Sequence, residues 1–182
     1  MSLDPAIWGT VFPELVRRSK PARAILGFRV SRIQAAGWPE TQVLLTSMHG
    51  RYVWQPGPNT ARCLAGTGHA VPASGCGCGF YACHGLRQLE FVLGAVMTSP
   101  DLVLVGVAGS GTVRIHERGW RAQFARILAF SDEGPGRNAK PQKRLAERTA
   151  RALEAMYHVP VVPLNKLPGV MVESGEFVEE IK

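Results

Sequence analysis

The chain has 182 residues, of which 46% are hydrophobic and 19% are charged. This composition is typical of one globular domain and excludes an intrinsically disordered chain. No apolar run approaches the ~20 residues of a transmembrane helix, and the first residues lack a secretory signal, so a cytoplasmic location is expected. The net charge of +7 favours a polyanionic partner such as nucleic acid, although it would equally serve solubility alone.

The N-terminal segment is expected to form a helix followed by a strand. The helix is predicted from residue 4, where an aspartate that can cap it precedes a proline. A kink or end is expected at Pro13, with a further helical turn at residues 15–16. Apolar and polar residues then alternate towards the end of residues 25–33. This alternation predicts a half-buried strand, with Arg29 and Arg32 in or near solvent.

Further strands are predicted where β-branched and apolar residues run together or alternate. They span residues 43–48, 51–54, 102–107, 112–117 and 120–130. His49-Gly50 is expected to join the first two as a hairpin, and Gly109-Ser110-Gly111 is expected to turn between the third and fourth. Residues 86–97 predict a helix, because apolar residues recur there at steps of three and four.

The C-terminal part is predicted to contain a polar linker, residues 131–142, and a helix, residues 142–157. Five residues of that helix are expected to form its buried face. They are Leu145, Ala152, Leu153, Met156 and Tyr157. Residues 159–164 are expected to be extended and confined by their prolines to a sheet edge.

All four cysteines lie within residues 63–83, and His69 and His84 lie beside them. The strongest pattern is Cys63-x5-His69-x6-Cys76-x-Cys78, in a segment rich in glycine and proline. Three thiolates and one imidazole are ligands that zinc prefers, and four protein ligands leave no open position for catalysis. The pattern therefore predicts a structural zinc site, with Cys83 or His84 as an alternative to one of the four ligands.

Other interpretations of the same residues are weaker. The Cys-x-Cys step is shorter than the usual zinc spacing, which leaves open that the cysteines are reduced and incidental. A zinc nucleobase deaminase would need a catalytic glutamate after the histidine, and none follows His69. A thiol nucleophile would pair Cys83 with His84, but residues adjacent in sequence rarely face each other in a catalytic dyad.

Arginine and lysine side chains are candidates for contact with nucleic acid or an acidic protein surface. The candidates are Arg51, Arg62, Arg87, Lys140, Arg144, Arg148 and Arg151. The last four recur along one face of the C-terminal helix, although nearby glutamates are equally typical of a solvated face. Aromatic residues near the first three could stack on bases or simply close the core over the metal loop. These are Tyr52, Trp54, Phe80 and Tyr81.

Three groups of sequence words resemble a family of small, uncharacterised proteins of actinobacteria and their phages. The words are Trp54-x-Pro56-Gly57-x-Asn59-x-Ala61-x-Cys63, then His69-x-x-Pro72 with Cys76-x-Cys78-Gly79-Phe80-Tyr81-Ala82, and finally Arg118-Gly119-Trp120-Arg121-Ala122-x-x-Ala125-Arg126. The resemblance covers residues 25–130 and includes the four proposed ligands. It implies a shared fold and host range, and it implies no activity.

These observations predict an α+β fold, with a small antiparallel sheet or partly open barrel and a C-terminal helix. The zinc-stapled loop is expected after the second or third strand. Residues 1–130 are assigned to a core domain with its N-terminal helix, and residues 131–182 to a linker and helical extension packed on that core. The leading function is a non-enzymatic intracellular zinc-binding protein that contacts nucleic acid or an acidic partner.

Two other functions stay open at this stage. One is an enzyme with a structural zinc and a separate cleft, for which acid–base groups must converge. The candidates for that role are His49, Glu90, His116 and Glu117. The other is a protein-interaction adaptor, which would need an extended apolar interface.

Overall fold

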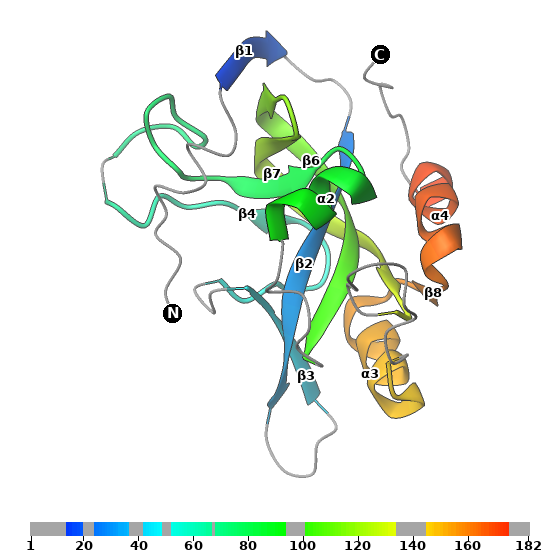
Figure 1. Ribbon diagram of the computed structural model, residues 1–182. Coiled ribbons are helices and arrows are strands. Elements are labelled where there is room, and N and C mark those ends of the chain that lie inside the picture. Colours follow the sequence, from blue (N-terminus) through cyan, green and yellow to red (C-terminus); the bar gives the residue numbers. More distant parts are fainter. Residues whose placement is uncertain are drawn as a thin grey trace.

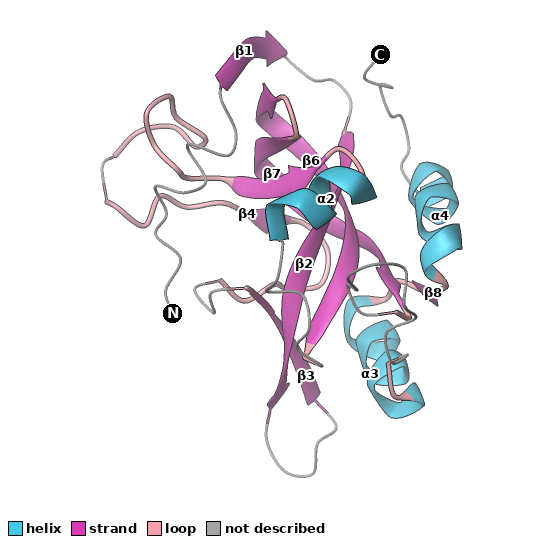
Figure 2. Ribbon diagram, viewed as in Figure 1, coloured by secondary structure: helices cyan, strands magenta, loops and turns pink. Residues whose placement is uncertain are grey.

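A computed structural model describes residues 14–19, 24–36, 42–48, 52–66, 68–93, 101–133 and 145–174 (Figure 1). The strands are β1 (Glu14–Ser19), β2 (Ile25–Ala36), β3 (Gln42–Ser47), β4 (Asn59–Thr60), β5 (Phe80–Cys83), β6 (Leu102–His116), β7 (Gly119–Ser131) and β8 (Val161–Val162). The helices are α2 (Leu86–Leu93), α3 (Glu147–Tyr157) and α4 (Leu167–Ser174), and a 3-10 turn spans Leu164–Lys166. Strands fill the centre of the molecule and helices lie outside them (Figure 2), so the predicted α+β class is confirmed.

The three long strands β2, β6 and β7 form the middle of the sheet. β6 is antiparallel to both β2 and β7, and the short β5 also pairs with both. These pairings run in a ring, but among the described residues β2 and β5 share only the Phe28–Cys83 pair, so the ring is not a continuous barrel. The predicted small antiparallel sheet is confirmed, with β8 as a short parallel addition to β7.

Side chains alternate along β6 and supply apolar residues to both faces of the sheet. Val103 and Val105 belong to a buried cluster that includes Leu153 of α3. Leu102 and Leu104 belong to a second cluster, to which α2 and α4 contribute. Because both faces are covered, β6 contains a nearly continuous apolar run from residue 102 to residue 108.

The predicted strand at residues 25–33 and the hairpin that follows it are confirmed within the described residues. β3 pairs with β2, and residues 52–54 return along β3 through backbone hydrogen bonds from Ser47 N to Tyr52 O and from Trp54 N to Leu45 O, both 2.8 Å. The turn at residues 49–50 lies outside the described residues. The helix predicted over residues 86–97 is observed as α2, and residues 94–97 also lie outside them.

The helical turn predicted at residues 15–16 is wrong, because residues 14–19 form β1. This strand pairs with the far end of β6, with Glu14 opposite His116 and Ser19 opposite Val113. An unpaired sheet edge offers backbone partners that local helix signals do not anticipate. The predicted start of the helix at residue 4 lies outside the described residues.

The turn predicted at Gly109-Ser110-Gly111 is also wrong, since β6 continues through these residues as one strand. The register with β7 shifts between Ser110 and Val113, and Gly111 has a φ of 75° at this bulge. The glycines are therefore signals of a β-bulge and of close packing instead of a chain reversal. The reversal comes later, at Glu117-Arg118, between β6 and β7.

We expect Gly109→Ala to lower the free energy of unfolding by ~1–3 kcal/mol, the usual range for overpacking a core. A methyl group there would press on the indole ring of Trp120 and lie 2.9 Å from the Cβ of Ala122. The indole cannot easily move, because its Nε1 donates a 2.8 Å hydrogen bond to the Leu26 carbonyl. Urea unfolding measures the change. Gly169→Ala in α4 is the control, since its methyl group would meet no atom within 4 Å, and no loss of stability is expected there.

The helix predicted over residues 142–157 is observed as α3, but its predicted start is wrong, because residues 145–146 are not helical and α3 begins at Glu147; residues 142–144 lie outside the described residues. The five residues of the predicted face are nevertheless turned to the core, with Leu145 just ahead of the helix. Leu153 and Tyr157 are buried, and the other three residues pack on the same cluster. The Tyr157 hydroxyl accepts a 2.8 Å hydrogen bond from Leu45 N and donates one to Trp54 O, which fixes α3 to the hairpin. α4 was not predicted, because Pro168 and Gly169 are typical helix breakers, but proline is tolerated in a first turn.

The predicted extended segment at residues 159–164 contains β8, which pairs with the end of β7. The division of the chain at residue 130 stays a prediction. Among the helices that the structure describes, none has the length and apolar character needed to cross a membrane.

Candidate metal centre

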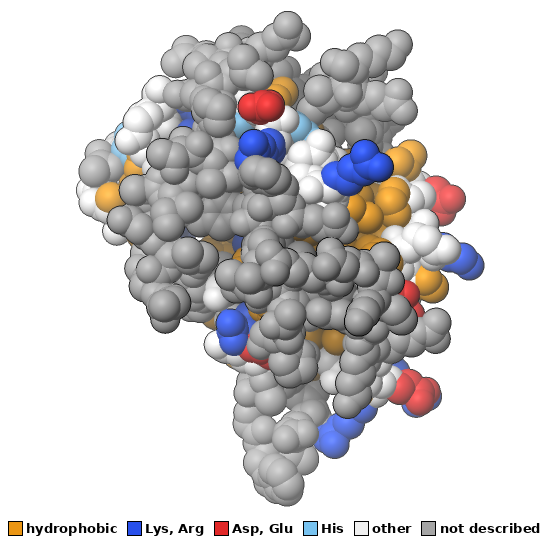
Figure 3. Space-filling model, viewed as in Figure 1, with side chains coloured by type: hydrophobic (Ala, Val, Ile, Leu, Met, Phe, Trp, Pro, Cys, Tyr) orange, Lys and Arg blue, Asp and Glu red, His pale blue; other side chains and the backbone are white. Residues whose placement is uncertain are grey.

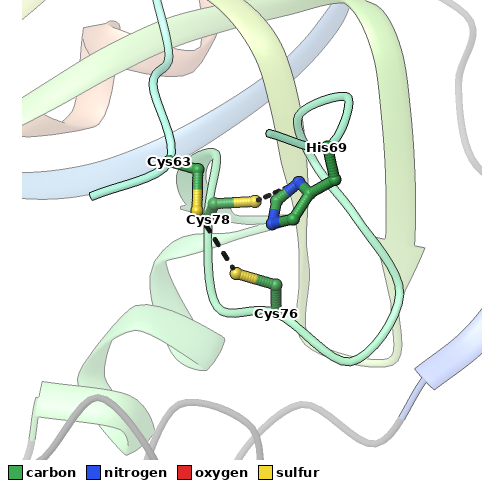
Figure 4. Close-up of side chains that lie close together, drawn as sticks. All are labelled: Cys63, His69, Cys76 and Cys78. Carbon is green, nitrogen blue, oxygen red and sulfur yellow. Dashed lines mark hydrogen bonds between the residues drawn. The ribbon is translucent and has the colours of Figure 1, made fainter. Parts of the chain in front are cut away.

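Cys63, His69, Cys76 and Cys78 come together in the loop between β4 and β5 (Figure 4). Their ligand atoms all lie within 4.8 Å of one another. The Sγ atoms of Cys63 and Cys76 are 3.7 Å apart. The His69 ring lies beside the Cys78 Sγ, which is 4.0 Å from its Nδ1, the ring nitrogen that faces the Ala70 carbonyl. With Zn–S bonds of ~2.3 Å, neighbouring sulfurs of a tetrahedral zinc site are ~3.8 Å apart. The cluster therefore has the size of a site for one metal ion.

The His69 ring is oriented by its own backbone neighbour. Its Nδ1 lies 3.0 Å from the Ala70 carbonyl oxygen, which can only accept a hydrogen bond. With the proton on Nδ1, the Nε2 carries a lone pair, and this atom is buried without a hydrogen-bond partner in the described structure. A ring fixed by a backbone carbonyl on one nitrogen is typical of metal-binding histidines. The orphaned Nε2 thus fits a metal ligand.

Asn59 holds the strand that leads into the cluster. This buried side chain accepts hydrogen bonds from Gln55 N at 2.8 Å and from the Tyr52 hydroxyl at 3.1 Å. Its amide group donates to the carbonyl oxygens of Gln55 and Gly57, both at 2.9 Å. One side chain therefore stabilises the turn before β4, the strand that leads to Cys63. This accounts for the asparagine in the Trp-x-Pro-Gly-x-Asn word.

The Cys76-Gly77-Cys78 step lies between two glycines with left-handed backbone. Gly75 has a φ of 71° and Gly79 a φ of 113°, a conformation that side chains rarely allow. These reversals let both thiols of so short a step face the same point. The Ala73 N–H donates a 3.5 Å hydrogen bond to the Cys78 Sγ, as is expected for a thiolate ligand.

Arg121 of β7 anchors the cluster to the sheet. It is a buried residue, with only 5% of its surface exposed. Its Nη1 donates to the carbonyl oxygens of Cys76 and Cys78, the second at 3.3 Å. Its Nε donates at 3.1 Å to the Nε2 of His116. One buried guanidinium thus holds the backbone of two candidate ligands. Its positive charge would also offset the single negative charge of a dication bound by three thiolates and a neutral imidazole.

Without a metal ion, the surroundings of Cys76 oppose the ionisation of its thiol. Burial raises the pKa of Cys76, and the neighbouring thiols of Cys63 and Cys78 raise it further, against a backbone hydrogen bond that lowers it. A bound dication reverses this balance, because a coordinated thiol loses its proton outright. The arrangement is therefore suited to metal coordination more than to free thiol chemistry.

The cluster found in the described residues does not include Cys83 or His84. Cys83 lies on β5 with 3% exposure, and burial raises the pKa of its thiol to about 12. The His84 Nε2 donates a 2.8 Å hydrogen bond to the His116 carbonyl oxygen. A neutral buried thiol beside an imidazole already engaged with backbone cannot act as a nucleophilic dyad.

The basic residues predicted to contact nucleic acid have mixed outcomes. Arg51, Lys140 and Arg144 lie outside the described residues. Arg62, Arg87, Arg148 and Arg151 are exposed, but Arg151 forms an ion pair with Glu147 one helical turn away. On the face shown in Figure 3, the described lysine and arginine side chains lie apart from one another. That view gives no continuous basic patch.

The aromatic residues near the loop mainly build core. Trp54 is 1% exposed, and its ring centroid lies 5.0 Å from that of the buried Phe80. Tyr52 packs edge-on against both rings. Trp54 is thus inaccessible to nucleic acid bases, and Trp54 and Phe80 both belong to the core beside the metal loop, which is the alternative that the sequence left open.

Two of the four acid–base candidates have described side chains. His116 is 4% exposed and its Nε2 accepts the Arg121 hydrogen bond, while Glu117 is exposed in the β6–β7 turn. His116 is therefore a support of the metal loop and not a group that a substrate can reach. His49 and the side chain of Glu90 lie outside the described residues.

Sequence reasoning missed Arg121 and Asn59 as residues that position the cluster. Each occurs in one of the sequence words quoted above, but spacing alone assigns neither a role. The loop itself follows β4 and not the second or third strand, because β1 and the short β4 were not predicted. Comparison with protein-family models, curated proteins and solved structures gives no match, so the function must be argued from this geometry.

Proposed function

We propose that this chain is a zinc-binding protein in which one structural zinc ion holds the β4–β5 loop against the sheet. The observation that carries the proposal is the convergence of three sulfurs and one imidazole nitrogen within 4.8 Å. This donor set is that of structural zinc sites, and four protein ligands leave no position for a reacting water. The zinc would therefore shape the protein and would not perform catalysis.

Elemental analysis of the protein, purified without added metal, tests this function. The expected result is about one zinc per chain, with other transition metals well below that level. Four titratable free thiols and no metal would overturn the proposal. Iron in place of zinc would retain the site and change its ion, because tetrahedral sulfur-rich sites also accept iron.

We propose further that the protein works inside the cell as a non-enzymatic binding module for nucleic acid or an acidic protein surface. Its net charge of +7 supports this, as do the exposed arginines Arg62, Arg87 and Arg148. We likewise propose that the chain shares its fold and host range with the actinobacterial and phage proteins that it resembles, a resemblance that implies no activity.

Fluorescence anisotropy with a labelled DNA duplex, a labelled single strand and polyglutamate tests the binding role. Affinity for nucleic acid should fall steeply between roughly 50 and 200 mM salt, because phosphate contacts release counterions. Binding to polyglutamate alone would assign the acidic protein surface. No binding at low salt, or binding that salt does not change, would contradict the polyanion role.

A further inference from the structure

A cavity of about 890 Å³ opens beside the metal loop. Its walls come from β2, β5, α2, the end of the β3 hairpin and the loop that carries Cys63, Cys76 and Cys78. Apolar and aromatic side chains form most of its surface. These include Phe28, Val30, Met48, Tyr52, Phe80 and Leu89. A concave, largely apolar pocket of this volume is the size that proteins use for small organic ligands.

One side chain in this pocket is a cation that forms no ion pair with another described residue. Arg29 of β2 lies with its guanidinium carbon 4.7 Å from the centroid of the Trp54 ring. Its Nε is buried and has no hydrogen-bond partner among the described residues. The described lining residues include a second arginine, Arg62, and no carboxylate. Arg29 was expected in or near solvent, and it is partly exposed, but it lines this pocket and its Nε is buried.

The described titratable groups that interact with Arg29, Cys83 and Tyr52, do not neutralise it. Burial lowers the pKa of the Arg29 guanidinium to about 10, so the side chain stays cationic at neutral pH. Cys83 and Tyr52 lie close by, and burial raises the pKa of each, which keeps both uncharged. A cation withdrawn from water without an anion is costly to the folded protein. An anionic ligand would offset that cost.

We propose that this pocket binds a small organic carboxylate with an apolar or aromatic body. The guanidinium carbon lies over the Trp54 ring, and in this proposal the ligand meets the N–H edge of the group. A carboxylate matches that edge in shape and can accept two parallel hydrogen bonds from it. The aromatic and aliphatic wall residues then receive the rest of the molecule.

The inference rests on the proposed function in one respect, because residues of the metal loop form one wall. Zinc content is therefore measured on every sample, so that a loss of the loop is distinguishable from a failure of the pocket. The charge that selects the ligand comes from β2, which is independent of the metal.

The test is displacement of 8-anilinonaphthalene-1-sulfonate, an aromatic anion whose fluorescence reports apolar pockets. The competitors are 2-naphthoate, its neutral amide 2-naphthamide, and 2-naphthyl phosphate. Loss of a charged hydrogen bond typically weakens binding by an order of magnitude or more. We expect 2-naphthoate to bind at least about tenfold more tightly than 2-naphthamide. Tighter binding of the phosphate than of the carboxylate would overturn the assignment of the ligand class.

Arg29→Met should remove the preference for 2-naphthoate over 2-naphthamide while leaving zinc content unchanged. Arg126→Met is the matched control, because Arg126 is exposed on β7, donates to the Ser174 carbonyl oxygen and does not line the pocket. Equal loss of binding in both variants would show a general charge effect and overturn the proposal. If Arg29→Met does not fold, the comparison of naphthoate with naphthamide on the unmodified protein decides. Equal affinity, or no binding of either, refutes the pocket.

Discussion

Replacing both Cys76 and Cys78 by serine is expected to abolish zinc binding and to lower the free energy of unfolding by about 4 kcal/mol when free zinc is ~1,000-fold above its Kd. The loop buries little apolar surface, since most residues at its tip, such as Leu64 and Ala65, are exposed. A metal ion that binds only the folded chain would then supply most of the loop's stability. The same loss is expected when a chelator strips the unmodified protein.

Thermal unfolding with and without added zinc measures the effect, together with zinc content by elemental analysis. Cys83→Ala is the matched control, because it removes the fourth thiol of the chain from outside the cluster. That variant should keep about one zinc per chain and respond to chelator as the unmodified protein does. Zinc retained by the double serine variant, or a stability that chelator leaves unchanged, would contradict a structural metal.

The candidate ligands were predictable because few residue types can do this chemistry. Cysteine and histidine are rare residues, so four cysteines within residues 63–83 leave only a few possible sets of metal ligands. The four residues of the predicted pattern, Cys63, His69, Cys76 and Cys78, are the four that form the cluster in the structure. The spacing does not predict which nitrogen of His69 would bind the metal. That choice depends on where the folded loop places the Ala70 carbonyl oxygen.

The strands were predictable where alternation was strong, and errors arose where a signal had two physical meanings. Glycines 109–111 are as suitable for a bulge against Trp120 as for a turn, and only the packing of β7 on β6 decides between them. β1 depends on a partner about 100 residues away in the sequence, His116 opposite Glu14, which no local pattern records. Nonlocal pairing was therefore the main limit on predicting this fold.

Two arginines that face inward were the least predictable part of the site: Arg121 is buried, and Arg29 is partly exposed with its Nε buried. Arg29 and Arg121 are charged residues in strands, and alternation alone places such residues towards solvent. Their inward orientation depends on partners from other segments, Trp54 for the first and the carbonyls of Cys76 and Cys78 for the second. A sequence pattern that treats every charge as exposed will miss the groups that organise a polar site inside a core.

Arg121→Met is expected to weaken zinc affinity by ~10–100-fold without removing any ligand, the usual range for an outer-shell partner. The variant loses the hydrogen bonds that hold the Cys76 and Cys78 carbonyls and leaves a buried His116 Nε2 without its donor. It also removes the cation beside three thiolates. Each orphaned buried acceptor costs ~1–3 kcal/mol, so the free energy of unfolding should fall as well.

Competition with a chromophoric zinc chelator at fixed pH measures the affinity of each variant. Arg121→Lys separates charge from geometry, because it keeps the cation and loses the planar fork. An affinity between those of the methionine variant and the unmodified protein is expected for it. Arg126→Met on the same strand controls for net charge and should bind zinc normally.

The comparison also decides what Arg121 does for the protein. If Arg121→Met loses stability but binds zinc as tightly as the unmodified protein, the guanidinium supports only the sheet and the loop forms its metal site unaided. If affinity and stability fall together, and zinc restores part of the lost stability, β7 and the metal loop act as one unit. The second result is expected, because one buried side chain binds the backbone of two ligands and the ring of His116, the last residue of β6.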